Sequence, residues 1–330
     1  MGSTLNGWSE RNVDLRFVLG EFTLGTWRLR GLVQSQHFLR LTGLDANPPL
    51  PFSRFPPGID VVKLPSHPIT DRLRRWTVLP EAIRYVPDQY QRYYIELTGS
   101  FAGYLAKFSS KTRSSLRRKV RKWAELCQTQ PCWRKYDKPE EMLEFHRLAR
   151  GISATTYQEK LLDAGLPDTE SYRCGLVELA RRDLVRGYLL FHRDRAVAYL
   201  CCPVDDGNMM YEYVGYDPDY GRWSPGAVLL YLVLEQSFSE QRFRTFDFTE
   251  GEGQHKEFFA SHDQFCADIY YFRRTLRHFA LLGIHTSLVG TSRTLVRATA
   301  SLGIKARLKK FFRGPAGRKS GNAPAPNEWT

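Results

Sequence analysis

The sequence predicts an α/β fold in which helices flank a mixed, mostly antiparallel sheet. Its second half has the pattern of two helices, three strands, a helix, a strand, a short helix and a strand. Strands joined by short turns form an antiparallel meander, and strand–helix–strand forms a βαβ unit. The 330 residues are 42% hydrophobic and 13% aromatic, which is enough to build the core of such a sheet.

The first 95 residues show few strand signals apart from apolar runs such as LRFVLG and IDVVKL. Prolines crowd residues 48–67, which indicates an extended connection. YYIELTG, at 93–99, is rich in β-branched and aromatic residues and is typical of a strand.

Residues 100–127 are predicted to be helical, and Ser109, Ser110 or Thr112 can cap the second part. The run from Lys107 to Lys122 holds eight Lys/Arg and no Asp/Glu. Such a run forms either a solvated helix face or a basic surface that lines an anionic groove or meets membrane lipid.

A helix starts at Pro139 in PEEMLEFHRLARGI, with acids in its first turn and arginines in its last, as the helix dipole favours. Another helix fits residues 169–182. Three antiparallel strands follow, at Gly187–His192, Ala196–Pro203 and Met209–Tyr216, joined through the turns R-D-R and D-D-G-N.

The next helix runs from Ser224 to about Ser239, and its segment VLLYLVL is apolar on every side, which predicts burial. RTFDFTEG is a strand with Phe246 and Phe248 on one face and Asp247 and Thr249 on the other. GQHKEFFASH reads as a short helix and QFCADIYYF as the last strand.

The joint RWSPGA, Arg222 to Ala227, begins the apolar helix. Ser224 is a suitable N-cap, Pro225 is favoured at the first helical position, and Gly226 and Ala227 keep the first turn free of bulk. Helix N-termini expose unpaired N–H groups that suit phosphate, and Arg222 can add a charge-assisted bond. The joint is therefore either a plain helix start or a phosphate site.

Three stretches, in this order, resemble the GNAT acyltransferase superfamily. They are YIELTGSFAGYLAKFSSKTRSSLRRKVRKW, YEYVGYDPDYGRWSPGAVLLY and FDFTEGEGQHKEFFA. The resemblance covers about residues 90–275. It is to the CelD-like branch, which is linked to bacterial cellulose and exopolysaccharide synthesis and is related to the Fem aminoacyltransferases.

The resemblance implies a GNAT fold in a tandem arrangement. Residues 1–135 would be a degenerate N-terminal GNAT-like half and 136–275 the acyltransferase domain. Residues 276–330 would be a basic amphipathic tail with a disordered end.

The resemblance also implies acyl-CoA as co-substrate, with its pyrophosphate at Arg222, Ser224, Gly226 and Ala227. The family pattern is Arg/Gln-x-x-Gly-x-Gly/Ala, so Ser-Pro is a departure from it.

Transfer of an acyl group to an amine requires a base, an oxyanion donor and a proton for the leaving thiolate. The catalytic candidates are Glu212, Tyr213 and Asp247. Neighbours along a strand alternate, so Glu212 and Tyr213 are expected to point to opposite faces. Each candidate can instead be an ordinary surface or ion-pairing residue.

The loop after the second of these strands supplies further candidates. Glu252 and Lys256 are candidates for substrate binding, with Glu250 and His255 beside them. Lys256 matches the family lysine and can bind an acidic acceptor or pair with Asp247. His255 stands where the family has tyrosine.

Of the 48 Lys/Arg, twelve lie between Arg273 and Lys319, which leaves 36 to balance 35 Asp/Glu. This tail mixes leucines and phenylalanines with its cations and predicts either contact with an anionic membrane surface or a helix docked on the body. The sequence has no apolar signal segment and no run of about 18 apolar residues, so a cytoplasmic protein, at most peripheral at the membrane, is expected.

Other classes find little support in the sequence. The six cysteines include no C-x-x-C, so no metal site is expected. G-x-S-x-G and Walker motifs do not occur, and no nucleic-acid-binding module is recognisable.

The favoured function is acyl-CoA-dependent N-acyltransfer to an amine, such as an amino sugar, in envelope or exopolysaccharide synthesis. The alternatives are a Fem-like aminoacyltransferase that uses aminoacyl-tRNA and a non-catalytic, membrane-associated module of the polysaccharide machinery.

Overall fold

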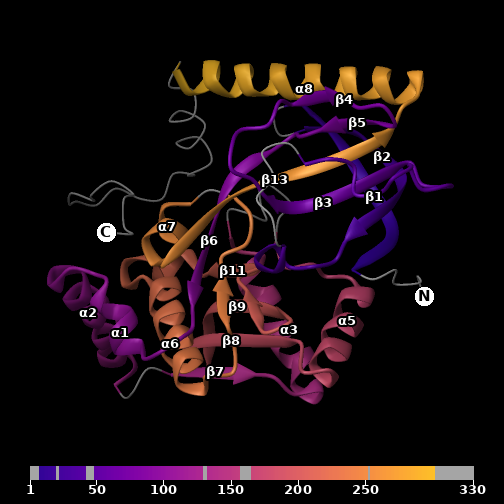
Figure 1. The fold of residues 1–330 in the computed structure, drawn as a ribbon. Coiled ribbons are helices and arrows are strands. Elements are labelled where there is room, and N and C mark those ends of the chain that lie inside the picture. The colour runs from indigo at the N-terminus through magenta and orange to yellow at the C-terminus, as the bar shows by residue number, and fades with distance from the viewer. Residues whose placement is uncertain are drawn as a thin grey trace. The chain divides into compact units, whose positions relative to one another are not determined.

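The computed structural model describes residues 7–19, 22–41, 48–128, 132–156, 165–251 and 253–301; the side chains of 18–19, 22–23 and 289–301 are not described. Two compact units divide the chain (Figure 1). Unit 1 takes residues up to Tyr90 and from Phe265, and unit 2 takes Gln91–Gln264. Both limits fall within strands, β6 (Gln89–Glu96) and β13 (His262–Arg273). They therefore differ from the predicted domain boundaries.

Unit 1 is built on a sheet, although its sequence shows few strand signals. Its strands are β1 (Trp8–Leu19), β2 (Phe22–Gln34), β3 (Val61–Pro68), β4 (Trp76–Val78) and β5 (Ala82–Tyr85), with most of β13. They pair in the order β1-β2-β3-β13-β5-β4, antiparallel except for β2 with β3. The extended connection expected over 48–67 is therefore a strand from Val61 onward.

One face of this sheet is covered by α8 (Leu276–Ser301). Phe279 and Leu282 of α8 pack into a core with Val13, Leu29 and other strand residues. The Tyr85 hydroxyl and His285 Nδ1 are 2.7 Å apart in a hydrogen bond. The first half of the predicted tail is thus a helix docked on its own unit; Leu295 and everything beyond residue 301 lie outside the described side chains.

Unit 2 contains the predicted meander and βαβ unit. The meander consists of β7 (Trp133–Tyr136), β8 (Val185–His192), β9 (Arg195–Asp205), β10 (Asn208–Met210) and β11 (Tyr213–Tyr216). α6 (Pro225–Glu240) then crosses to β12 (Thr245–Asp247), which pairs parallel with β10 and antiparallel with β6. This confirms the predicted fold class.

Helices cover both faces of this second sheet. On one face, α6 packs with α1 (Phe101–Ala106) and α2 (Ser110–Cys127) around Trp123. On the other face lie α3 (Met142–Ser153), which follows the 3-10 turn η2 (Pro139–Glu141), and α5 (Glu170–Arg181). Of the three predicted caps of α2, Ser109 is the one used, and it accepts a hydrogen bond from the Thr112 N–H.

Candidate functional site

The strand that precedes the joint is broken by a β-bulge. Met209 pairs with Val204 and Tyr213 with Cys201, so three residues of one strand lie opposite two of β9. As a result Tyr211 packs on the α6 side of the sheet and Tyr213 on the α3 and α5 side. The predicted single strand Met209–Tyr216 is therefore two strands, with Glu212 at the break.

The side chains of Glu212 and Tyr213 form a hydrogen bond, although neighbours along a regular strand are expected to point to opposite faces. Burial raises the pKa of Glu212, a hydrogen bond with Tyr213 lowers it, and the charge of Glu250 raises it. Burial, followed by the charge of Glu212, raises the pKa of Tyr213 to about 12. The site thus offers a carboxyl group of raised pKa beside the Tyr213 hydroxyl, which is protonated at neutral pH.

Asp247 ends β12 and is fully buried. The Nε of Arg92 donates to both of its oxygens at 3.1 Å, and Nη2 donates to Oδ2 at 2.5 Å. The Thr249 N–H donates to Oδ1 at 2.9 Å. Both carboxylate oxygens of Asp247 are therefore engaged in the fold.

Thr249 adopts a left-handed backbone conformation with φ of 59°, which is rare for a β-branched residue. While the Thr249 backbone N–H donates to Asp247, the Thr249 hydroxyl donates to the Tyr211 carbonyl at 3.2 Å. The Arg92–Asp247 pair and Tyr211 thus fix the turn that follows β12 next to the β10–β11 break. Residues held in strained conformations cluster at functional sites.

The short helix α7 (Gln254–Phe259) brings His255 and Lys256 to this turn. Lys256 Nζ donates to the Glu250 carbonyl at 2.7 Å, and burial is the main cause that lowers its pKa. Burial, followed by the charge of Lys256, lowers the pKa of His255 to about 4, so its imidazole is neutral at physiological pH. Glu252 lies outside the described residues.

The neutral His255 predicts acid sensitivity of unit 2. Its pKa rises from about 4 in the folded protein to the ordinary 6.5 in the unfolded chain, so protonation favours unfolding as pH falls from 6.5 to 4. We expect His255→Asn to reduce the loss of unfolding free energy across this window by about 2 kcal/mol. Urea unfolding at several pH values measures it, with His262→Asn at an exposed position as control. Equal pH slopes for wild type and His255→Asn would contradict the assignment.

The joint begins α6 with the predicted residues, and Ser224 is the N-cap residue, but the side-chain capping bond does not form. Ser224 stands at the N-cap in a left-handed conformation (φ 51°), and its side chain makes no capping hydrogen bond. Its carbonyl accepts from the Val228 N–H at 3.1 Å, while the N–H groups of Gly226 and Ala227 lie in the first turn, where a helix supplies no acceptor. Arg222 is exposed, and its guanidinium lies 3.7 Å from the ring centroid of Trp223.

The segment before α6 is a 3-10 turn, η3 (Pro218–Trp223), held by side chains of the meander. Buried Asp217 pairs with Arg195 and accepts from the Asp219 N–H at 3.0 Å. The Tyr220 hydroxyl and His192 Nδ1 are 3.0 Å apart. The N–H groups of Gly226 and Ala227 therefore follow a turn that side chains hold in place. In the chain, β11 separates this turn from Glu212.

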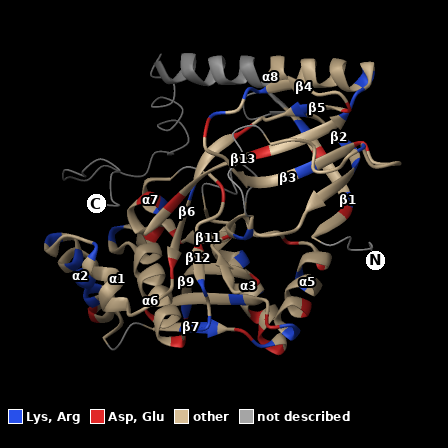
Figure 2. Ribbon diagram, in the orientation of Figure 1, with Lys and Arg blue, Asp and Glu red and all other residues tan. Residues whose placement is uncertain are grey.

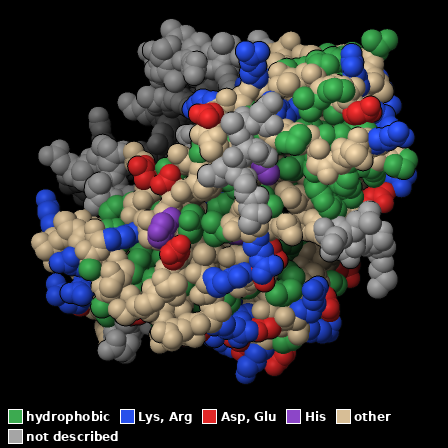
Figure 3. Space-filling model, in the orientation of Figure 1, with side chains coloured by type: hydrophobic (Ala, Val, Ile, Leu, Met, Phe, Trp, Pro, Cys, Tyr) green, Lys and Arg blue, Asp and Glu red, His purple; other side chains and the backbone are tan. Residues whose placement is uncertain are grey.

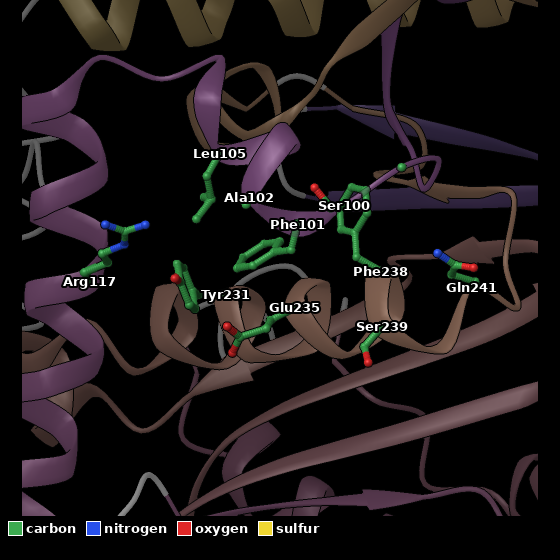
Figure 4. Close-up of a pocket in the computed structure, with 11 residues that line it drawn as sticks. Ser100, Phe101, Ala102, Leu105, Arg117, Tyr231, Glu235, Phe238, Ser239 and Gln241 are labelled. Carbon is green, nitrogen blue, oxygen red and sulfur yellow. The ribbon is translucent and has the colours of Figure 1, made fainter.

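Two cavities of about 550 Å³ each lie in unit 2. One lies beside Glu212 and α5, and its lining residues are Pro167, Thr169, Ser171, Tyr172, Gly175, Leu176, Leu179, Pro203 and Glu212. The other lies between α1, α2 and α6, and its lining includes Phe101 of α1, Arg117 of α2, and Tyr231, Glu235 and Phe238 of α6 (Figure 4). The Glu212 cavity is the one that contains a predicted catalytic residue.

The basic run forms most of α2, and its cations gather on one part of the surface (Figures 2 and 3). Lys107, just before α2, is used within the fold. Its Nζ donates to the carbonyls of Phe259 and Ala260 at the end of α7, and burial lowers its pKa to about 8. Lys111, Arg118 and Lys122 are exposed, which agrees with a solvated helix face and with a basic surface alike.

Three residues of this site were not predicted as site residues from the sequence. Strand pairing places Arg92 beside Asp247, the packing of α5 places Tyr172 at the cavity, and a strained turn positions Thr249. Within the described ranges, no group of three His, Cys, Asp or Glu is placed to hold a metal ion. Nor is any described helix both long and apolar enough to cross a bilayer.

Comparison with solved structures found several of similar backbone. The C-terminal domain of a putative lysylphosphatidylglycerol synthetase from Agrobacterium fabrum has 9% identity and a TM-score of 0.42, covering 69% of this chain and 72% of that one. L-PGS from Bacillus licheniformis has 12% identity and a TM-score of 0.40, covering 71% and 74%. FemX has 10% identity and a TM-score of 0.39, covering 58% and 63%.

No curated protein matches the chain. Residues 110–257 match the family of the acetyltransferase (GNAT) domain. The matched segment runs from α2 to α7 and includes the β10–β11 break, the start of α6 and the turn after β12. Residues 110–257 are therefore similar to a GNAT-type acetyltransferase domain.

Proposed function

We propose that this protein is an N-acyltransferase that uses acyl-CoA and an amine acceptor. The observation that supports the proposal is the pair of backbone N–H groups of Gly226 and Ala227 in the first turn of α6. This buried helix lies inside the segment that matches the acetyltransferase domain. Arg222, an exposed cation, precedes it by a few residues. Amides and a helix dipole of this kind suit a pyrophosphate.

The residues at the strand break supply the chemistry. Glu212 accepts a proton from the acceptor ammonium, and the neutral amine nitrogen then forms a bond to the thioester carbonyl carbon. The carbon–sulfur bond breaks, and the leaving thiolate takes the proton of the Tyr213 hydroxyl. The Tyr213 phenolate then takes the second proton of the nitrogen, which leaves a neutral amide, and Glu212 returns its proton to water. Asp247 acts as a positioning residue, because Arg92 and the Thr249 N–H occupy its oxygens.

The finer parts of the proposal rest on the sequence resemblance. They are an amino-sugar acceptor in cell-envelope or exopolysaccharide synthesis, membership of the CelD-like branch and a cytoplasmic location. A role of Lys256 in substrate binding, a GNAT-like origin of residues 1–135 and peripheral membrane contact through the tail are proposals of the same kind.

Gly226→Asp tests the donor site. An added carboxylate in the first turn suits the helix dipole, so stability should hold, whereas its charge opposes a pyrophosphate. We expect acetyl-CoA and longer acyl-CoAs to bind the wild type in calorimetric titration and Gly226→Asp to weaken that binding at least 10-fold. Ser110→Asp, in the first turn of α2, is the matched control.

The same titration separates the alternatives. Absence of acyl-CoA binding to the wild type would overturn the donor assignment. Binding of aminoacyl-tRNA in its place would favour the Fem-like alternative, and binding of neither would favour a non-catalytic module.

A further inference from the structure

The cavity beside Glu212 has one wall without formal charge and one wall that carries the Glu212 carboxylate. Tyr172, Gly175, Leu176 and Leu179 of α5 follow helical spacing and form the uncharged wall. Pro203 and Glu212 face them from the sheet. A volume of about 550 Å³ is within the range of small-molecule sites.

Charge inside this cavity has a single sign. Among the described residues that line it, Glu212 is the one with a formal charge, and the rest offer hydroxyls or apolar groups. The Tyr172 hydroxyl lies 3.9 Å from Cys201 Sγ, and burial raises its pKa so that it stays protonated. The neighbouring arginines, Arg150 and Arg173, are paired with Asp168.

We infer that this cavity is the acceptor site and that it selects primary amines on an uncharged, hydroxylated or aromatic body. The ammonium meets Glu212, while Thr169, Ser171 and Tyr172 meet the body. A phosphate or carboxylate on the acceptor would lie against the Glu212 carboxylate, and the described residues of the lining supply no cation to offset it, so anionic acceptors are rejected. This inference rests on the proposed function and adds the acceptor class to it.

Gly175 makes the inference testable. A Cβ built at Gly175 meets nothing within 4 Å, so a larger side chain extends into the cavity without displacing a neighbour at its base. Leucine also suits a helix interior better than glycine does. Gly151, on the exposed side of α3, has equally open space and provides a matched Gly→Leu control.

The experiment measures amine binding directly and does not depend on turnover. Glucosamine and tyramine are titrated into wild type, Gly175→Leu and Gly151→Leu, alongside counterparts that carry an added anionic group: glucosamine 6-phosphate, with a phosphate, and tyrosine, with a carboxylate. We expect at least one neutral-bodied amine to bind the wild type at least 10-fold more tightly than its counterpart. Gly175→Leu should weaken that binding at least 10-fold and Gly151→Leu by less than 2-fold.

Equal binding of the anionic counterparts, unchanged binding in Gly175→Leu, or no amine binding by the wild type would overturn the inference. The acyl-CoA affinity of Gly175→Leu is measured in parallel and should equal that of the wild type. Selective amine binding without any acyl-CoA binding would reject the proposed donor while leaving the acceptor site in place.

Discussion

Replacing Glu212 with glutamine is expected to lower kcat/KM for amine acylation by about 10²- to 10⁴-fold, the usual contribution of a general base. Glutamine keeps the shape of the side chain but cannot accept the proton of the ammonium. A loss smaller than about 10-fold would show that Glu212 is not the base.

The pH dependence sharpens this test. Burial, and then the charge of Glu250, raise the pKa of Glu212 above the ordinary 4.5, so the acidic limb of kcat/KM lies above that value. Activity falls as pH falls through this pKa because the protonated carboxyl is no longer a base. Glu250→Gln should move the limb to lower pH, and Glu212→Gln should abolish it. Glu178→Gln, at an exposed pair with Arg181, is the control.

Asp247→Asn is expected to lower the free energy of unfolding by about 3 to 5 kcal/mol, because it leaves the Arg92 guanidinium buried without its counter-charge. Asp247 is fully buried and makes three contacts with Arg92 at 2.5 to 3.1 Å. The substitution also weakens the hydrogen bond from the Thr249 N–H, which stabilises the strained turn. Urea unfolding measures the effect.

Asp14→Asn, at an exposed pair with Arg28, makes the same chemical change where water screens the charges. Its expected cost is below about 1 kcal/mol. In a double-mutant cycle, Arg92→Leu with Asp247→Leu should cost less than the sum of the two single changes, because no buried charge remains unpaired. A loss below about 1 kcal/mol for Asp247→Asn would contradict a structural role for this pair.

Sequence patterns predicted unit 2 well because its signals are local. The turns that bound β9, the cap Ser109 and the all-round apolar α6 each lie within a short stretch of the chain. Residues 1–95 were harder, since β3 pairs with β2 and β13, strands far from it in the chain. The prolines of this region concealed β3, because a short stretch of sequence does not include the strands with which β3 pairs.

The sequence by itself determined the order of elements in unit 2, the GNAT resemblance and the helix start at Ser224–Ala227. Only the tertiary structure decided how the candidates act together. A bulge of one residue places Glu212 and Tyr213 in contact, and strand pairing gives Asp247 its partner Arg92, 155 positions away. Burial by distant elements then sets the pKa shifts of Glu212 and His255. Such effects depend on which segments meet in space, and the local pattern of a sequence does not contain that information.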